Sequence, residues 1–309
     1  PIEEEKGEPS HSIKWYVTGT PIQNYQRDLR TLFSLLGIRG GGASLKILAK
    51  TYLIRRTKVE VGLLTNIELQ PKTIQVKPTC EIEKALAQLI HSKLSFSMQK
   101  IADCNSLEQL NRLVGLLEGE SVFPLFIAAR QCAVMPQLIV NKIKFRARLL
   151  EQFRGGDRVE LEKTLNEIKV KSAKMTAVIE IIEACKNDGR KIIFAHYRKE
   201  IDEYQKLLTE KKFKVGILDG RSKRSERKDI LADKVKLDVL IVQIKSGCEG
   251  LNLQKYSQVY FTSPHWNPAV DDQAIARAHR IGQLNNVQVF KFVYSGISDD
   301  NDSITLEQY

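Results

Sequence analysis

The chain has 309 residues, 42% of them hydrophobic, and a formal net charge of +11. This length favours two domains with packed cores, and no apolar run is long enough to span a membrane. The excess positive charge suggests a polyanionic partner, with nucleic acid as the first choice and an acidic protein surface as the second. The five cysteines are dispersed without a Cys-x-x-Cys pair, which favours a reduced, intracellular protein without a metal site.

The first part of the chain predicts one short strand and several helices. Residues 13–17 are rich in β-forming side chains and lead into Thr18-Gly-Thr-Pro21, which predicts a strand followed by a turn. Apolar spacing then predicts helices over 28–36 and 45–55. Residues 80–168 are expected to be mainly helical, because leucines recur there at near-helical intervals.

From residue 172 the sequence alternates between helical and strand patterns. Strands are expected at 191–195, 214–218, 238–242, 258–262 and 287–293. Helices are expected at 174–185, 200–209, 224–232 and 268–279. This alternation predicts an α/β fold with a parallel sheet covered by helices on both faces.

Four polar segments follow predicted strands. They are residues 18–21, 219–222, 245–250 and 263–268. Because ligands of open α/β sheets bind at the carboxyl ends of the strands, we expect these segments to share one working edge. In the third segment Gly247 and Gly250 allow close backbone approach to a phosphate, although an ordinary strand-to-helix turn would also explain them.

Two arginines, Arg277 and Arg280, stand three residues apart in the segment 273–283. On a helix this spacing directs both guanidiniums the same way. Each guanidinium is a rigid fork of donors that matches phosphate oxygens, so the pair suits a transferring phosphoryl group. The alternative for an isolated Arg-x-x-Arg is a basic, solvated helix face.

Five segments in a fixed order resemble the Swi/Snf family of DNA-dependent ATPases in helicase superfamily two. They are residues 17–24, 53–58, 246–253, 264–268 and 273–283. The Trp-Asn-Pro at 266–268 and the His-Arg-Ile-Gly-Gln at 279–283 are specific to that family. Cys248 departs from the pattern, because the family often has a second glycine there, and Met135 stands where the family usually has histidine.

The resemblance implies a RecA-like helicase C-terminal lobe plus a mainly helical insertion. Residues 1–66 would be the tail of a first lobe and a linker, 67–171 a helical region, and 172–309 the second lobe. The chain contains neither Gly-x-x-x-x-Gly-Lys-Ser/Thr nor Asp-Glu-x-His. We therefore expect a fragment that does not hydrolyse ATP alone, with ATP and Mg²⁺ held mainly by the first lobe.

The resemblance also implies roles for individual residues. Arg277 and Arg280 would be arginine fingers that bind ATP together with Gly247 and Gly250, and Gln273 would orient the nucleotide or the hydrolytic water. The expected DNA-binding residues are Arg221, Ser222, Lys223, Lys245, Ser246 and Trp266. The alternatives are a solvated basic loop around 219–227 and a packed structural role for the tryptophan.

The implied activity is ATP-driven translocation on double-stranded DNA, with remodelling of nucleosomes or other protein–DNA complexes. The protein would act in the nucleus, or in a viral replication compartment if it is viral. Two alternatives stay open: a strand-separating helicase of the same superfamily, and a DNA-binding scaffold that has lost its ATPase activity.

Overall fold

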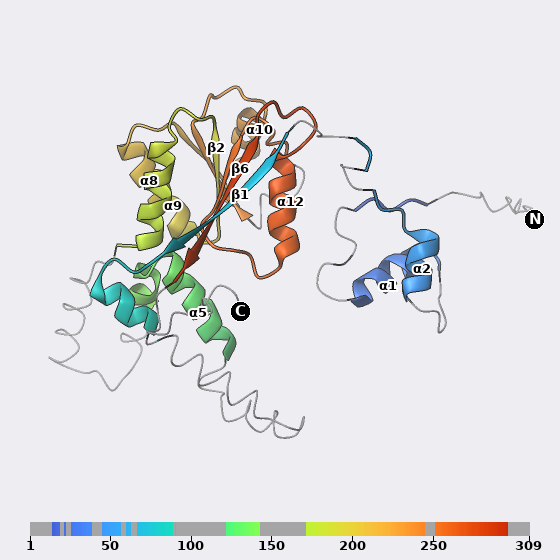
Figure 1. The fold of residues 1–309 in the computed structure, drawn as a ribbon, viewed down its shortest axis with the longest axis horizontal. Helices are drawn as coiled ribbons and strands as arrows, with labels where there is room; N and C mark the ends of the chain where they lie inside the picture. The colour runs from blue at the N-terminus through green and yellow to red at the C-terminus, as the bar shows by residue number, and fades with distance from the viewer. Residues whose placement is uncertain are drawn as a thin grey trace, which may run out of the picture. The chain divides into compact units, whose positions relative to one another are not determined.

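The computed structural model describes residues 14–18, 22, 26–38, 45–56, 60–62, 67–88, 90, 122–142, 171–244 and 251–295. They belong to two compact units, Pro1–Leu63 and Leu64–Tyr309 (Figure 1). No helix within these ranges is long and apolar enough to cross a membrane.

The first unit contains the two predicted helices, α1 (Gln26–Leu35) and α2 (Leu45–Tyr52). Phe33 of α1 is buried and its ring meets that of Tyr52 edge-on, with centroids 6.4 Å apart. The predicted strand over 13–17 is wrong for residues 14–17, which form no strand and are exposed. A β-rich run becomes a strand only when it finds a hydrogen-bonded neighbour, and these residues find none among the described ones.

The second unit is built on a six-stranded, all-parallel sheet, so the predicted α/β fold class is confirmed. The strand order is β1-β6-β5-β2-β4-β3. The strands are β1 (Leu69–Val76), β2 (Lys191–Ala195), β3 (Val215–Leu218), β4 (Val239–Gln243), β5 (Gln258–Phe261) and β6 (Val287–Tyr294). Five of these six strands match the sequence prediction to within a residue or two.

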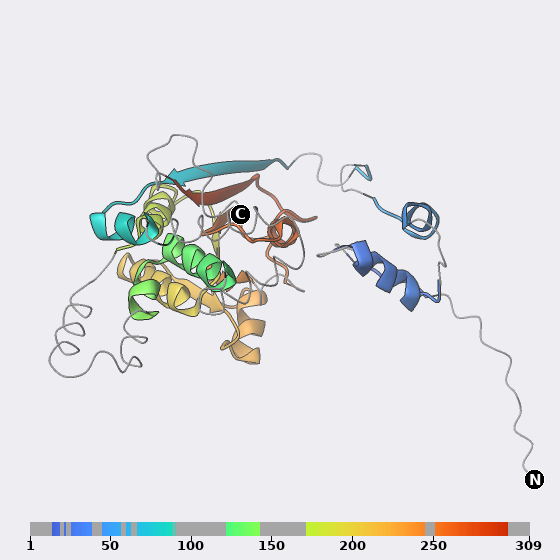
Figure 2. The same cartoon turned by 90° about the horizontal axis from the view of Figure 1, so that it is seen from below.

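Strand β1 was not predicted from the sequence. It pairs with β6 along its whole length, from Leu69 opposite Val287 to Val76 opposite Tyr294 (Figure 2). Its hydrophobic pattern is weak because β1 is an edge strand. Much of its surface is exposed to solvent, and a proline such as Pro71 is tolerated there. This strand makes residues 69–76 part of the same sheet as the later strands.

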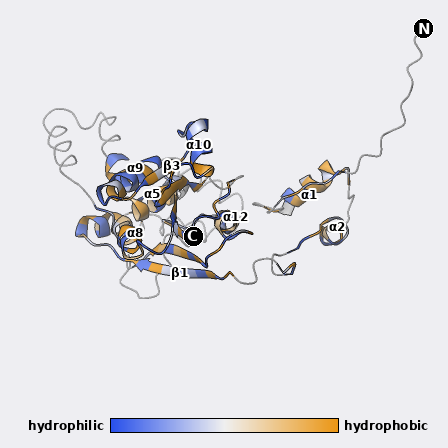
Figure 3. Cartoon of the chain, turned by 90° about the horizontal axis from the view of Figure 1, so that it is seen from above, coloured by the Kyte–Doolittle hydropathy of each residue, from blue (hydrophilic) through white to orange (hydrophobic). Residues whose placement is uncertain are grey.

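Helices cover both faces of the sheet. Helices α8 (Ala173–Ala184) and α9 (Arg198–Glu210) pack on one face, and α10 (Arg224–Leu231) and α12 (Pro268–Ala278) on the other. Every residue of the central strand β2 is buried, with alternate side chains supplying the two cores. That explains its continuous apolar run. Figure 3 shows α9 and α10 largely in hydrophilic blue, as expected for helices with one wet face.

A third core joins the helical segment to the sheet. It includes Ala129 and Cys132 of α5 (Val122–Val134), Ala87 of the helical residues 81–88, and Tyr294 at the end of β6. The buried carboxylate of Glu83 accepts hydrogen bonds from the backbone N–H groups of Thr79 and Ala173, at 3.1 and 3.0 Å. The described part of 80–168 is therefore helical, while residues 91–121 and 143–170 lie outside the described ranges.

Candidate nucleic-acid interface

The predicted site residues fall at two opposite edges of the sheet. Because the strands are parallel, the loops 196–197, 219–222 and 262–267 all lie at the carboxyl edge. Helix α12 starts at that edge and runs back, so that its last residue, Ala278, lies at the amino edge where β6 begins. The sequence analysis expected the loops 219–222 and 263–268 to share one edge, and their described residues do. Arg277 and Arg280, which were not part of that expectation, lie at the opposite edge.

Trp266 projects from the loop that follows β5 and is 62% exposed. Its ring lies 5.5 Å from that of His265, which in turn stacks at 6.0 Å on His196 in the loop after β2. The ring contacts thus run from part-buried His196 through part-buried His265 to exposed Trp266. An exposed indole on a supported base is suited to contacting an external partner.

His196 holds the loop after β5 in place. Its Nε2 atom lies 2.9 Å from the carbonyl oxygen of Ser263. Burial lowers the pKa of His196 to about 4, so the ring is neutral near pH 7 and its Nε2–H donates to that carbonyl. The sequence analysis assigned no chemistry to this histidine, and the structure gives it a supporting role.

The buried carboxylate of Glu200 ties the two loops together. It accepts hydrogen bonds from the backbone N–H groups of His196 and Tyr197, at 2.9 and 3.0 Å, and from the hydroxyl of Thr262. Glu200 is fully buried, and that burial raises the pKa of its carboxyl group. Glu200 is the third residue of α9, so its carboxylate reaches back to the backbone N–H of the residue that precedes the helix.

Asn267 and Asp271 fix the other end of the same loop. The Asn267 side chain caps α12 by accepting from the Ala269 N–H at 3.0 Å. The Asp271 carboxylate accepts from the His265 N–H at 3.3 and 3.4 Å and lies 3.9 Å from the Nζ of Lys291. Burial raises the pKa of Asp271 to about 6. The loop that presents Trp266 is therefore held at both ends.

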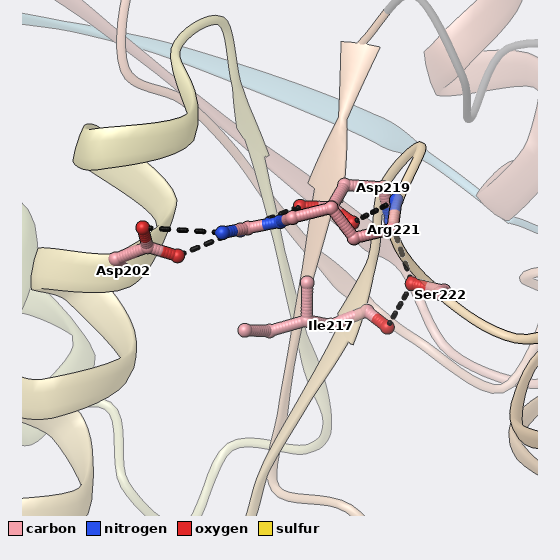
Figure 4. Close-up of polar contacts among 5 residues, drawn as sticks. All are labelled: Asp202, Ile217, Asp219, Arg221 and Ser222. Atoms are coloured by element: carbon pink, nitrogen blue, oxygen red, sulfur yellow. Dashed lines mark hydrogen bonds and ion pairs between the residues drawn. The ribbon is translucent and has the colours of Figure 1, made fainter.

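Arg221 lies in a second loop at the carboxyl edge, after β3, and Figure 4 shows it reaching across to α9. Its Nε donates to Asp219 at 2.8 Å, while Nη1 and Nη2 donate to the two oxygens of Asp202 at 3.2 and 2.6 Å. Burial alone would raise the pKa of Asp219, but the hydrogen bonds from Arg221 outweigh it and hold that pKa below its usual value. Nothing in the sequence marked Asp202 as a partner.

Ser222 in the same loop makes two hydrogen bonds to the backbone of its own turn. Its hydroxyl accepts from the Asp219 N–H at 3.0 Å and donates to the Ile217 carbonyl at 3.1 Å. These bonds close the turn that Figure 4 shows between β3 and α10. Lys223, the next residue, is exposed at the start of α10.

The two arginines of the 273–283 segment do not share one helix. Helix α12 ends at Ala278, His279 caps it with a ψ of 78°, and Arg280 lies in the exposed turn beyond. The argument that helical spacing aligns both guanidiniums is therefore wrong. Gln273 and Arg277, four residues apart on α12, are the pair that share a helix face.

Contacts around the end of α12 place it at the amino edge. The Arg277 carbonyl accepts from the Leu253 N–H at 3.1 Å, and His279 Nε2 lies 3.1 Å from the carbonyl of Ile67, just before β1. The Gln283 side chain donates to the carbonyls of Tyr256 and Ala278, at 3.1 and 3.2 Å. The His-Arg-Ile-Gly-Gln sequence thus builds a tight, fixed turn that carries the exposed Arg280.

The predicted residues Lys245, Ser246, Gly247 and Gly250 lie outside the described ranges. Among the described residues no group of three or more His, Cys, Asp or Glu side chains could hold a metal ion. The guanidiniums of half-buried Arg277 and exposed Arg280 suit the phosphates of a nucleotide.

Residues 173–282 match the family model of the helicase conserved C-terminal domain. In sequence this part of the chain is similar to the C-terminal domains of helicases and SWI2/SNF2-type ATPases. In fold it resembles the SWI2/SNF2 ATPase core of Sulfolobus solfataricus in complex with dsDNA, with a TM-score of 0.50 and 20% identity. That match covers 87% of this chain and 51% of the other.

Two curated relatives extend the comparison. The chain is 35% identical over 123 residues to the chromatin-remodeling ATPase INO80 of Schizosaccharomyces pombe, covering 39% of this chain. It is 25% identical over 345 aligned residues to the DNA excision repair protein ERCC-6-like of Bos taurus, covering 92% of this chain. The chain spans 8% of the first relative's length and 27% of the second's.

Proposed function

We propose that the chain supplies the second lobe of an ATP-dependent translocase on double-stranded DNA. The observation that carries this proposal is a helicase C-terminal fold with two separate basic surfaces. An exposed tryptophan and basic residues lie at the carboxyl edge, and Arg277 and Arg280 lie at the amino edge. A translocase needs such a division, because it must grip a polyanionic track with one surface and respond to nucleotide with another.

The amino edge would serve ATP hydrolysis. Arg277 and Arg280 would stabilise charge that develops on the transferring phosphoryl group, and Gln273 would orient the nucleotide or the attacking water. Gly247 and Gly250 would let the backbone approach the phosphates. A first RecA-like lobe with its own phosphate cradle would hold most of the ATP and its Mg²⁺, because these 309 residues contain no such cradle.

The carboxyl edge would grip the DNA backbone without reading sequence. Lys223, Lys245 and Ser246 would contact phosphates, and Trp266 would lie against the duplex. Arg221 and Ser222 enter this proposal as residues that shape the loop, since both are engaged in contacts within the chain. The net charge of +11 supports a polyanionic track.

The names of the relatives suggest where such a motor would work. One is a chromatin-remodeling ATPase and the other a DNA excision repair protein. We therefore propose nucleosomes or other DNA-bound proteins as its targets and the nucleus as its location. A strand-separating helicase is the competing activity.

The experiment is to join this chain to a first lobe and measure ATP hydrolysis with and without duplex DNA. We expect stimulation by duplex of any sequence, displacement of a third strand from a triplex, and no separation of a simple duplex. Efficient strand separation would favour the helicase alternative. Duplex binding without any hydrolysis, in a protein with an intact first-lobe cradle, would favour a scaffold.

A further inference from the structure

The loop after β3 carries a conspicuous arginine whose donors are already engaged. Four contacts of 3.2 Å or less join the Arg221 guanidinium to Asp202 and Asp219. Asp219 is 3% exposed, so withdrawing the guanidinium to bind a phosphate would leave a buried carboxylate without its partner. An arginine held in this way stiffens the loop and is a poor candidate for gripping an external anion.

A second arginine, Arg198, lies over the same turn. Arg198 is the first residue of α9, directly after the loop that follows β2, and it is exposed. A side-chain carbon at Gly220 would lie 3.9 Å from Arg198 Nη2, so the guanidinium sits just above the turn. Within the described residues no hydrogen bond or ion pair engages it.

The surroundings explain why Arg198 is presented in this way. The negative charge of Asp219 acts on it at longer range, and that attraction favours a position over the turn without occupying its donors. Gly220 has no side chain to cover it. Exposed Lys199 and Lys223 flank the two loops and add positive charge.

We propose that Arg198 is the arginine by which this loop contacts a phosphate of the DNA backbone, and that Arg221 is the fixed brace beneath it. This proposal rests on the proposed duplex-DNA function. A free fork of five donors suits a phosphate in two-point contact, and a contact of this kind positions the lobe on the duplex without specifying bases.

The test is duplex binding by the 309-residue chain across a salt series, with a melting curve for each variant. Losing one phosphate contact reduces the magnitude of the slope of log affinity against log salt by about 0.9. At 0.1 M salt this corresponds to about an eightfold loss of affinity. We expect that loss for Arg198→Ala, with an unchanged melting temperature. Arg198→Lys should keep the slope and lose part of the affinity, because lysine keeps the charge without the fork.

Lys206→Ala is the matched control, because it removes one charge from the same helix eight residues further on. We expect it to change the slope by less than half as much. Arg221→Ala should lower the melting temperature, as removal of a brace would. The inference is overturned if Arg198→Ala binds like Lys206→Ala, or if Arg221→Ala loses the full slope at an unchanged melting temperature. If the unaltered chain shows no salt-dependent duplex binding, the proposed function fails first.

Discussion

The carboxyl and amino edges of the sheet hold their functional side chains by different means. At the carboxyl edge three buried carboxyl groups, those of Glu200, Asp219 and Asp271, each accept backbone hydrogen bonds from a surface loop. At the amino edge Arg280 follows a helix cap and is held by backbone contacts of the turn around it. The first surface is preorganised by buried carboxyl groups, and the second carries an exposed cation.

This difference has a consequence for what each edge can do. Buried, hydrogen-bonded carboxylates keep a loop in one shape, which suits repeated contact with a regular polymer such as a duplex. An exposed arginine on a fixed turn acts only when another surface brings the charge that it stabilises. We therefore expect variants at the amino edge to change turnover, and variants at the carboxyl edge to change DNA binding or stability.

The largest expected effect concerns Arg280→Ala at the amino edge. In the protein joined to a first lobe, it should lower turnover at saturating ATP and DNA by about 10³- to 10⁵-fold while sparing both binding steps, because a finger acts on charge in the transition state. Arg280→Lys should rescue little, since it loses the fork. We expect Arg277→Ala to lower turnover in the same way. If the Arg280→Ala protein turns over as fast as the unaltered protein, the amino edge has no catalytic role.

The second prediction concerns Trp266→Ala at the carboxyl edge. Because the indole is 62% exposed, we expect little change in melting temperature and a loss of roughly 1.5–3 kcal/mol in duplex affinity, the scale of burying a large apolar side chain. Phe261→Ala is the control, because that ring lies at the end of β5 and is fully buried. Its removal should cost about 3–5 kcal/mol in stability. A melting curve for Trp266→Ala that resembles the Phe261→Ala curve would show that the tryptophan is structural.

The sequence predicted the sheet better than it predicted the site. Strands such as β2 and β4 are short apolar runs whose residues face two cores, and that pattern is local. Strand β1 escaped prediction because an edge strand depends on its neighbour β6, which lies more than 200 residues later. The separation of the two edges follows from the antiparallel run of α12, and it could have been deduced once the helix boundaries were fixed.

The pairing of Arg221 could not have been predicted from its loop alone. Its stronger partner by distance, Asp202, lies on α9, and no motif links the two positions. A basic residue in a phosphate-type loop carries the same sequence signal whether its donors are free or engaged. Local pattern therefore identified the right loop and left the roles of Arg221 and Arg198 undetermined.

The third prediction uses the raised pKa of Asp271. Its folded-state pKa of about 6 exceeds the usual value of 3.8, so its contribution to stability is present at low pH and is lost as pH rises through about 6. Asp271→Asn cannot titrate there. Relative to it, the unaltered protein should lose about 1.4 kcal/mol of unfolding free energy between about pH 5 and pH 8. Urea unfolding at both pH values measures this.

Asp272→Asn controls for the change in net charge, because that neighbouring carboxylate is exposed. We expect the pH-dependent change in unfolding free energy to disappear in Asp271→Asn and to remain in Asp272→Asn. If the two variants shift together, net charge explains the effect, and the carboxyl edge does not depend on a buried acid at this point.

The smallest expected effect concerns Ser222→Ala, which removes one hydroxyl from the loop after β3. The Asp219 N–H would lose its acceptor and the Ile217 carbonyl its donor, so we expect a loss of about 1 kcal/mol in unfolding free energy. Ser222→Thr keeps the hydroxyl and should retain most of that stability. Duplex affinity should fall only as far as the loop loosens. If Ser222→Ala instead weakens duplex binding at unchanged stability, its hydroxyl contacts the backbone directly, and the carboxyl edge grips DNA with the same groups that hold its loops.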